Sequence, residues 1–333
     1  MSYKTILVVK NRAMGDSVMG LSTLQYIKEL YPSAKIIYAL PLWITRLYKN
    51  VDIASDEVIS CDLKNAKDWL ALFKKMRKIK PDVIFEMQQG GRTKKFFGTY
   101  SKIFGIPYFF HNHHISSGGN IHDQGVIKAV IQRDLDGAFS TLSHKERYPS
   151  YLHYTPKVSF SRKYKKRVIL GVVATRQTKM WSLSKYVDLC KLIKRDFPCL
   201  NIVIPLSKSS GDMEISKELT ALGISSIANL EYVELENLFE YIGNSKLYIG
   251  NDTGLKHIAI AAGIKSYTFF GPEPPNEWHP YNEKDHPYFY KEGLDCRTEH
   301  AHYCGLSVCE SMICLNEFRP EDIYQVIKKD LDD

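Results

Sequence analysis

Short runs of β-branched residues alternate with stretches of helical periodicity along the whole chain. The run Thr5–Val9 is apolar without polar alternation, which is typical of a parallel strand buried on both faces. A loop that contains Gly15 follows, and apolar positions then recur at helical spacing over Ser17–Tyr31. The same succession of strand, loop and helix starts again at Arg167. The alternation predicts an α/β protein with two doubly wound parallel sheets.

The remaining elements are placed by the same pattern. We expect strands at residues 34–40, 57–60, 81–86, 167–174, 201–205, 247–249 and 266–271, and helices at 69–79, 182–196, 234–244 and 254–262. Residues 144–167 are rich in Tyr, Pro and Lys and lack a period, so we place the domain boundary there. We predict Rossmann-like domains over 1–160 and 161–333, whose sheets present their carboxyl edges to each other across a cleft.

The stretch from Lys246 to Gly263 carries the clearest signal of a binding site. A short strand turns sharply into a helix at Gly254, which leaves the first helical N–H groups without partners. These donors and the positive end of the helix dipole suit an anionic group such as a diphosphate. Asp252 and Thr253 are able to cap the helix, and His257 lies about one turn inside it. The alternative is a capped helix with a surface histidine.

Asp16 stands near the N-terminus, where a loop enters the first helix. A carboxylate at this point is either a helix N-cap or a group at the carboxyl edge of a parallel sheet, where open α/β sheets bind ligands. The Gly-Asp pair by itself does not decide between these two roles.

The charge of the chain is unevenly distributed. Residues 1–160 hold 23 Lys and Arg against 13 Asp and Glu, whereas residues 161–333 hold 22 against 24. A basic first half indicates an anionic partner, either anionic lipid headgroups, a phosphorylated acceptor or nucleic acid. The sequence has no zinc-finger or RNP-type signature, so we do not expect nucleic acid. A solvated basic surface is the alternative.

A glycine-rich basic segment at residues 88–95 is the first candidate for contact with an acceptor. We expect it to be a loop, in which Arg92, Lys94 and Lys95 hold an acceptor phosphate or are simply solvated. Four histidines follow at residues 111–122, but their spacing matches no known metal site. We therefore expect residues 111–125 to form a mobile surface loop.

The expected location of the protein is the cytosol. Its longest apolar runs, such as Ile6–Val9, are too short to span a bilayer, and the N-terminus lacks the layout of a signal peptide.

Four of the seven cysteines gather near the C-terminus, at Cys296, Cys304, Cys309 and Cys314. A cytosolic location argues against disulfides, and the spacing lacks the C-x2-C of common zinc sites. A structural metal at this cluster stays open as an alternative.

Three segments resemble the ADP-heptose:lipopolysaccharide heptosyltransferases, glycosyltransferase family 9. They are residues 6–36 with Met14-Gly15-Asp16, the segment 174–181, and residues 250–257 together with Phe270-Gly-Pro272 and Trp278. The resemblance implies a GT-B fold and an inverting mechanism without a metal requirement. It also implies a cytosolic enzyme that works at the inner membrane face.

The resemblance also implies roles for individual residues. Asp16 matches the general base, which takes the proton from an acceptor hydroxyl. Lys179 matches a lysine on the donor diphosphate, in a donor-site loop that includes Thr175, and Glu214 matches an acidic residue on the nucleotide ribose. In the C-terminal motif, Asp252 is expected to bind donor sugar hydroxyls, the Thr253 and Gly254 amides to bind phosphate, and His257 to donate to the leaving group. Asn251 and Lys256 depart from the pattern, and Lys256 is itself able to reach phosphate.

The function predicted from these residues is glycosyl transfer. A heptose or related sugar moves from ADP-heptose or another nucleotide sugar to a lipopolysaccharide core or other cell-surface glycan. Two alternatives remain open: a nucleotide-sugar epimerase or hydrolase, and a non-catalytic nucleotide-sugar-binding paralogue. A Rossmann dehydrogenase is disfavoured because no strand is followed by G-x-G-x-x-G.

Overall fold

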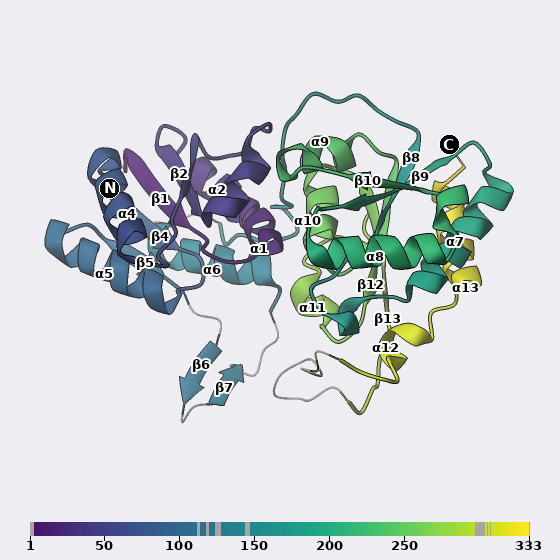
Figure 1. Ribbon diagram of the computed structural model, residues 1–333. Coiled ribbons are helices and arrows are strands. Elements are labelled where there is room, and N and C mark those ends of the chain that lie inside the picture. The colour runs from purple at the N-terminus through teal and green to yellow at the C-terminus, as the bar shows by residue number, and fades with distance from the viewer. Residues whose placement is uncertain are drawn as a thin grey trace. The chain divides into compact units, whose positions relative to one another are not determined.

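The computed structural model describes residues 3–111, 114–117, 120–123, 128–143, 147–296, 304, 306 and 308–332 (Figure 1). The chain divides into two compact units, Met1–Ser159 and Phe160–Asp333. Each unit contains one parallel sheet with helices packed on it, and each is described by itself below.

Unit 1 is built on a five-stranded parallel sheet in the order β3-β2-β1-β4-β5. The strands are β1 (Thr5–Val9), β2 (Lys35–Leu40), β3 (Glu57–Ser60), β4 (Val83–Glu86) and β5 (Tyr108–Phe110). The helices are α1 (Met14–Met19), α2 (Leu21–Leu30), α3 (Leu42–Thr45), η1 (Arg46–Tyr48), α4 (Ala66–Ile79), α5 (Gly91–Phe104) and α6 (Val130–Leu142). Side chains from Ile6 to Val9 are fully buried because helices cover both faces of the central strand.

The first helix is shorter than the periodicity predicts. Instead of one helix over Ser17–Tyr31, α1 and α2 are separated at Gly20. The hydroxyl of Tyr38 donates to the carbonyl oxygen of Ser17 at 2.8 Å. In a continuous helix this oxygen would accept from the backbone N–H four residues later. A Cβ at Gly20 would lie 2.4 Å from the Tyr38 hydroxyl oxygen. Glycine therefore allows β2 to approach the helix at this break.

Two segments that were expected to be loops contain regular structure. The glycine-rich segment 88–95 becomes helical at Gly91, so its basic residues lie on α5. Part of the expected mobile loop 111–125 forms the antiparallel hairpin of β6 (His114–Ser117) and β7 (Asn120–Asp123). Gly105 at the end of α5 has φ +65°, a left-handed conformation that ends the helix, and the chain then enters β5.

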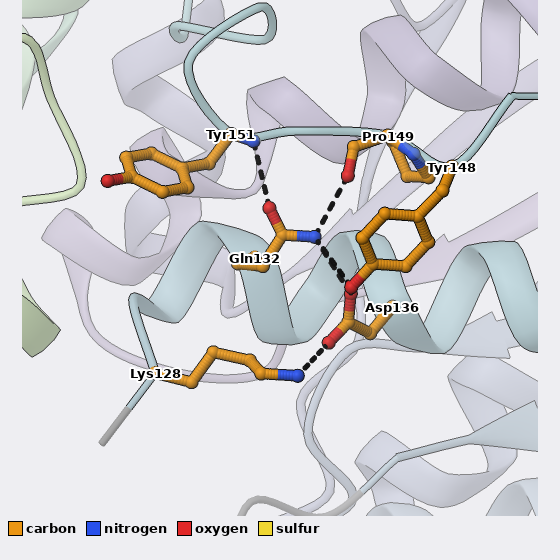
Figure 2. A network of polar contacts seen from close by, with 6 residues as sticks. All are labelled: Lys128, Gln132, Asp136, Tyr148, Pro149 and Tyr151. Carbon is orange, nitrogen blue, oxygen red and sulfur yellow. Dashed lines mark hydrogen bonds and ion pairs between the residues drawn. The ribbon is translucent and has the colours of Figure 1, made fainter. Parts of the chain in front are cut away.

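A polar network fixes the chain that leaves α6, in the aperiodic part of the sequence (Figure 2). The side chain of Gln132 accepts from the backbone of Tyr151 at 2.9 Å and donates to the carbonyl oxygen of Pro149 at 2.9 Å. Asp136 accepts from Lys128 at 2.6 Å and from the hydroxyl of Tyr148. Side chains of α6 thus replace the backbone pairing that a strand or helix would give to residues 148–151.

Unit 2 is built on a six-stranded parallel sheet in the order β10-β9-β8-β11-β12-β13. Its strands are β8 (Arg167–Gly171), β9 (Asn201–Leu206), β10 (Asn229–Tyr232), β11 (Leu247–Asn251), β12 (Lys265–Phe270) and β13 (Tyr288–Tyr290). Its longer helices are α7 (Leu183–Asp196), α8 (Ser210–Ala221), α9 (Leu238–Gly243), α10 (Gly254–Ala261) and α13 (Pro320–Ile327). Short helices are η2 (Gln177–Lys179), η3 (Ile224–Ser226), η4 (Leu235–Asn237), α11 (Pro275–Trp278), α12 (Ile313–Asn316) and η5 (Lys328–Asp330). Stacked rings of Trp181 and Phe269, 4.3 Å apart at their centroids, lie in its core.

Both sheets reverse their strand order at one point. In unit 1 the reversal lies between β1 and β4, and in unit 2 it lies between β8 and β11. Loops that leave the carboxyl ends of such neighbouring strands diverge, so ligands bind there in open α/β sheets. The segments after β1 and β11 carry the motifs with Asp16 and Asp252, and the segment after β8 carries Lys179. No helix in the described part of the chain is long and apolar enough to cross a membrane.

Candidate active site

Asp16 lies in the first turn of α1, beside the reversal point of unit 1. Ala13 occupies the N-cap position, so the interpretation of Asp16 as the N-cap is wrong. The Asp16 carboxylate instead accepts a hydrogen bond from the Ala13 backbone N–H. Burial raises the pKa of Asp16, and the positive charges of Lys10 and Arg12 only partly oppose this effect. A carboxylate with a raised pKa is a stronger base than an ordinary aspartate, as proton transfer from a hydroxyl requires.

A buried ion pair lies close enough to Asp16 to affect its charge. The Lys10 ammonium is 2.6 Å from Oδ2 of Asp134, and both side chains are fully buried. The other oxygen of Asp134 lies 2.9 Å from Nε2 of His111. Sequence reasoning missed this cluster, although a lysine directly after a fully apolar strand was a usable signal. Buried charges are paired, so Lys10 required a carboxylate partner elsewhere in the chain.

The basic residues proposed for the acceptor lie on the first turns of α5. Arg92, Lys94 and Lys95 are all exposed. The start of α5 is held by Glu86, at the end of β4, which accepts from the Gly90 backbone at 3.2 Å and from the hydroxyl of Thr93. The helix thus directs the three side chains to solvent.

In unit 2, Asp252 forms ion pairs with two lysines at once. Its Oδ2 is 2.8 Å from Nζ of Lys179, and its Oδ1 is 2.6 Å from Nζ of Lys256. Burial opposes ionisation of this carboxyl, but the charges of Lys179 and Lys256 outweigh burial and hold its pKa well below the usual range. The expectation that Asp252 caps α10 is therefore wrong. Thr253 occupies the N-cap position, without a capping hydrogen bond from its side chain.

The two lysines differ in their access to a ligand. Lys256 is fully buried, and its ammonium also donates to the carbonyl oxygen of Trp278 at 2.9 Å and lies 4.6 Å from the ring centroid of Phe270. The expectation that Lys256 itself reaches phosphate is wrong for this arrangement. The side chain of Lys179 is 17 % exposed and is held only at its tip. Of the two lysines, Lys179 is therefore the one that is accessible to a bound anion.

Asn251 fixes the loop that carries Lys179. Its Oδ1 accepts from the Trp181 backbone N–H and from the Tyr186 hydroxyl, each at 3.0 Å. Its Nδ2 donates to the carbonyl oxygen of Val172 at 2.8 Å, and the residue is fully buried. A side chain with these three bonds connects β11 to both ends of the segment after β8. Asn251 thus positions the Lys179 loop against Asp252.

The other predicted donor-site residues, His257, Thr175 and Glu214, take no part in the ion pairs of Asp252 described above. His257 is buried on α10, and its Nδ1 lies 2.5 Å from the Tyr281 hydroxyl. Burial lowers the pKa of His257 well below its ordinary value, so the imidazole is neutral. Thr175 is exposed on the loop that carries Lys179. Glu214 is exposed on α8, and in the described structure it makes no ion pair with the Asp252 cluster.

An ion pair next to this cluster was not predicted. Arg176, on the Lys179 loop, pairs with Glu273. Burial raises the pKa of Glu273, while Lys179 and Arg176 lower it. Glu273 lies in the proline-rich segment 271–281, outside every motif of the sequence analysis, so no local pattern indicated this ion pair.

The cysteine cluster is not assembled in the described part of the chain. Cys296 is exposed, whereas Cys309 and Cys314 are half-buried and contact the core of unit 2. Among the described residues, no group of three His, Cys, Asp or Glu side chains is arranged to hold a metal ion. Residues 297–303, 305 and 307, between these cysteines, lie outside the described structure. The histidine-rich segment also falls partly outside it, at residue 113.

Two Rossmann-like units, each a parallel sheet with helices packed on it, are the architecture of the GT-B fold, which this chain shares with solved heptosyltransferase structures. The family model of glycosyltransferase family 9 (heptosyltransferase) matches residues 134–302, and the chain belongs to this family. The resemblance of its motifs to that family is thereby confirmed.

Relatives of known identity agree with this assignment. The chain is 25 % identical over 297 residues to lipopolysaccharide heptosyltransferase 1 of Campylobacter coli, which covers 81 % of this chain and 84 % of that protein. Among solved structures it resembles E. coli ADP-heptose lps heptosyltransferase II, with a TM-score of 0.72, 16 % identity and 98 % of each chain covered. It also resembles E. coli heptosyltransferase WaaC with ADP, with a TM-score of 0.67, 15 % identity, and 98 % of this chain and 99 % of that chain covered. The predicted fold class and glycosyltransferase activity are confirmed.

Proposed function

We propose that the enzyme transfers a heptose from ADP-heptose to a lipopolysaccharide-core acceptor with inversion at the anomeric carbon. The names of the relatives support the sugar and the acceptor, and the solved structure of WaaC with ADP supports the nucleotide. We further propose that the reaction takes place in the cytoplasm, at the inner face of the membrane where a lipid-linked acceptor is available.

The observation that carries this proposal is the Lys179–Asp252–Lys256 cluster at the start of α10. A diphosphate at this point meets the free backbone N–H groups of Thr253 and Gly254 and the positive end of the helix dipole. Lys179 turns from Asp252 toward the phosphate, while Lys256 keeps Asp252 paired. The buried carboxylate is therefore not left as an isolated charge when the donor binds.

The leaving group needs positive charge as the bond to the sugar breaks. Lys179 supplies a point charge at the diphosphate, and the α10 amides supply oriented dipoles. We propose that these groups take the place of a divalent metal in catalysis. Before the donor binds, Asp252 holds Lys179 in place through their ion pair. Once Lys179 has turned to the phosphate, Asp252 is proposed to bind donor sugar hydroxyls. His257 and Glu214 complete the proposed donor site.

Asp16 is proposed as the base in the other unit. It accepts the proton of the acceptor hydroxyl while that oxygen attacks the anomeric carbon from the face opposite the diphosphate. Direct displacement of this kind inverts the configuration, and no covalent sugar–enzyme intermediate forms. The raised pKa of Asp16 favours proton acceptance. Arg92, Lys94 and Lys95 are proposed to attract an acceptor that carries phosphate.

The test is a transfer assay with a panel of nucleotide sugars and a water-soluble lipopolysaccharide-core acceptor, analysed by mass spectrometry and by NMR of the new linkage. We expect heptosylated acceptor with inverted configuration from ADP-heptose, in the presence of a chelator as well as in its absence. Donor consumption without acceptor would instead indicate the hydrolase or epimerase class. Transfer from a different nucleotide sugar would support the assignment as a glycosyltransferase but show that ADP-heptose is not the donor.

A further inference from the structure

Helices α4 and α5 lie side by side on one face of the unit 1 sheet (Figure 1). Contacts between them repeat every four residues on both helices, as two parallel helices require. The contacts are Trp69–Phe96 at 5.6 Å and Phe73–Tyr100 at 6.0 Å between ring centroids, followed by Arg77 4.4 Å above the ring of Phe104. These contacts pack the two helices against each other into one continuous surface.

A shallow apolar groove of about 300 Å³ runs along this surface. The rings of Trp69, Phe96 and Tyr100 form part of its wall. Three large apolar side chains stand at its rim in water: Leu70 is 56 % exposed, Phe73 is 38 % exposed and Ile103 is 63 % exposed. Grouped apolar exposure on a folded surface indicates an interaction site, unlike single scattered residues.

The same two helices carry an exceptional charge. Together α4 and α5 hold nine Lys and Arg and one Asp, a net charge of +8, which equals the formal net charge of the whole chain. Eight of the nine cations are exposed, and the carboxylate of Asp68 is used to cap α4. In the described ranges, no carboxylate forms an ion pair with these exposed cations. Their charge is therefore available to an external partner.

The cations are interleaved with the apolar residues. Lys67 and Lys74 lie three residues before and four residues after Leu70, on the same stripe of α4. Lys102 precedes Ile103, and Lys95 lies two turns earlier on the same side of α5. The surface formed by these side chains and the groove is called the α4–α5 face below.

We propose that the α4–α5 face docks on an anionic lipid bilayer. Leu70, Phe73 and Ile103 enter the boundary between headgroups and acyl chains, and the surrounding lysines lie at the level of the lipid phosphates. Amphipathic surfaces with aliphatic and aromatic residues flanked by Lys bind membranes in this way, and each nearby cation adds to the attraction. The proposal deepens the membrane location given above but does not depend on the transferred sugar.

Other occupants fit less well. A second copy of this chain would bring another surface of net charge +8 against the first, which is repulsive. Nucleic acid would pair with the lysines but would leave the aliphatic side chains of Leu70 and Ile103 without an apolar environment. A bilayer supplies both the negative charge and the apolar layer over an extended plane.

The test is co-sedimentation of the full-length protein with vesicles of phosphatidylcholine alone or mixed with phosphatidylglycerol, at low and high salt. We expect binding to the mixed vesicles only, with a loss at high salt because the Debye length shortens. The double variant Leu70→Ser with Ile103→Ser, and the charge-reversal variant Lys67→Glu with Lys74→Glu, should each lower the partition coefficient at least about tenfold. All four positions are exposed, so thermal stability should be unchanged.

The matched control is Leu222→Ser with Val326→Ser in unit 2, where the side chains are 39 % and 43 % exposed. This variant should bind vesicles like the wild type. Equal binding to neutral and anionic vesicles would overturn the proposal, as would wild-type binding by both α4–α5 variants. A concentration-dependent dimer that Leu70→Ser with Ile103→Ser abolishes would assign the face to self-association instead. Transfer to a water-soluble acceptor should persist in every variant, so a failed docking proposal is distinguishable from a failed enzyme assignment.

Discussion

Asp16 in unit 1 and Asp252 in unit 2 each lie beside the two strands where the order of a parallel sheet reverses. Among the residues that the structure describes, each unit also buries one lysine completely, Lys10 in the first and Lys256 in the second. In unit 1 this lysine pairs with a third residue, Asp134, whereas in unit 2 it pairs with Asp252 itself. The pKa of Asp16 is raised by burial, while the pKa of Asp252 is held low by Lys179 and Lys256.

The difference lies in what each carboxylate is able to do. Asp252 is neutralised by two cations and serves as a counter-ion that holds Lys179 in place. Asp16 forms no ion pair in the described structure, so its charge is available to a substrate proton. Because Lys256 pairs with Asp252, that carboxylate has a structural role. Because Lys10 pairs with Asp134 instead, Asp16 remains a candidate catalytic residue.

The largest expected effect on stability comes from Asp252→Asn. This change leaves Lys256 buried without its counter-ion, which should lower the free energy of unfolding by about 3–5 kcal/mol. Urea denaturation of the purified variant measures the loss. Adding Lys256→Met removes the unpaired charge, so the double variant should regain much of the lost free energy of unfolding. A loss below about 1 kcal/mol in the single variant would show that Asp252 is not the counter-ion described here.

A smaller effect, on binding alone, is expected from Lys179→Met. Asp252 keeps Lys256 as its partner, so the fold should persist. The lost charge-assisted hydrogen bond to the diphosphate should weaken ADP binding about 10- to 100-fold, as measured by calorimetry. Lys208→Met is the control, because Lys208 is 76 % exposed in the same unit. Unchanged ADP affinity in Lys179→Met would place the nucleotide elsewhere.

The smallest effect concerns the stability of Asp16→Asn. Because the pKa of Asp16 is raised in the folded protein, ionising it costs folding free energy at neutral pH. The variant should therefore be at least as stable as the wild type at pH 7. This difference should vanish as pH falls below the unfolded pKa of about 3.9, where the wild-type carboxyl is protonated in both states. Thermal melts of both proteins between pH 7 and pH 3 measure the sign of this stability difference. A less stable variant at pH 7 would contradict a raised pKa.

Much of the fold was predictable because the strands of both sheets are buried on both faces. Apolar runs such as Thr5–Val9 therefore stand out, and the Gly254 helix start carries its own turn signal. Edge strands β5, β10 and β13 were missed, since they are short and only half-buried. The break at Gly20 was also invisible, because it depends on the hydroxyl of Tyr38 from another element.

The candidate site was predicted in its residue types more than in its pairing. The motifs named Asp16, Lys179 and Asp252, but no local pattern shows that Lys179 and Lys256 share one carboxylate. Asp134 lies in a region without a recognisable motif, and its contact with Lys10 spans most of unit 1 in sequence. Such contacts depend on tertiary packing, which periodicity and turn chemistry do not encode.

The central claim is that Asp16 is the proton acceptor and Asp252 is not. Its most direct test is turnover by Asp16→Asn at saturating donor and acceptor, normalised to folded protein, with ADP affinity measured on the same sample. We predict a fall in kcat of about 10²–10⁴-fold, the usual range for a lost general base, with ADP affinity unchanged because unit 2 is intact. A fall of less than about tenfold would contradict the account and place the base at another residue.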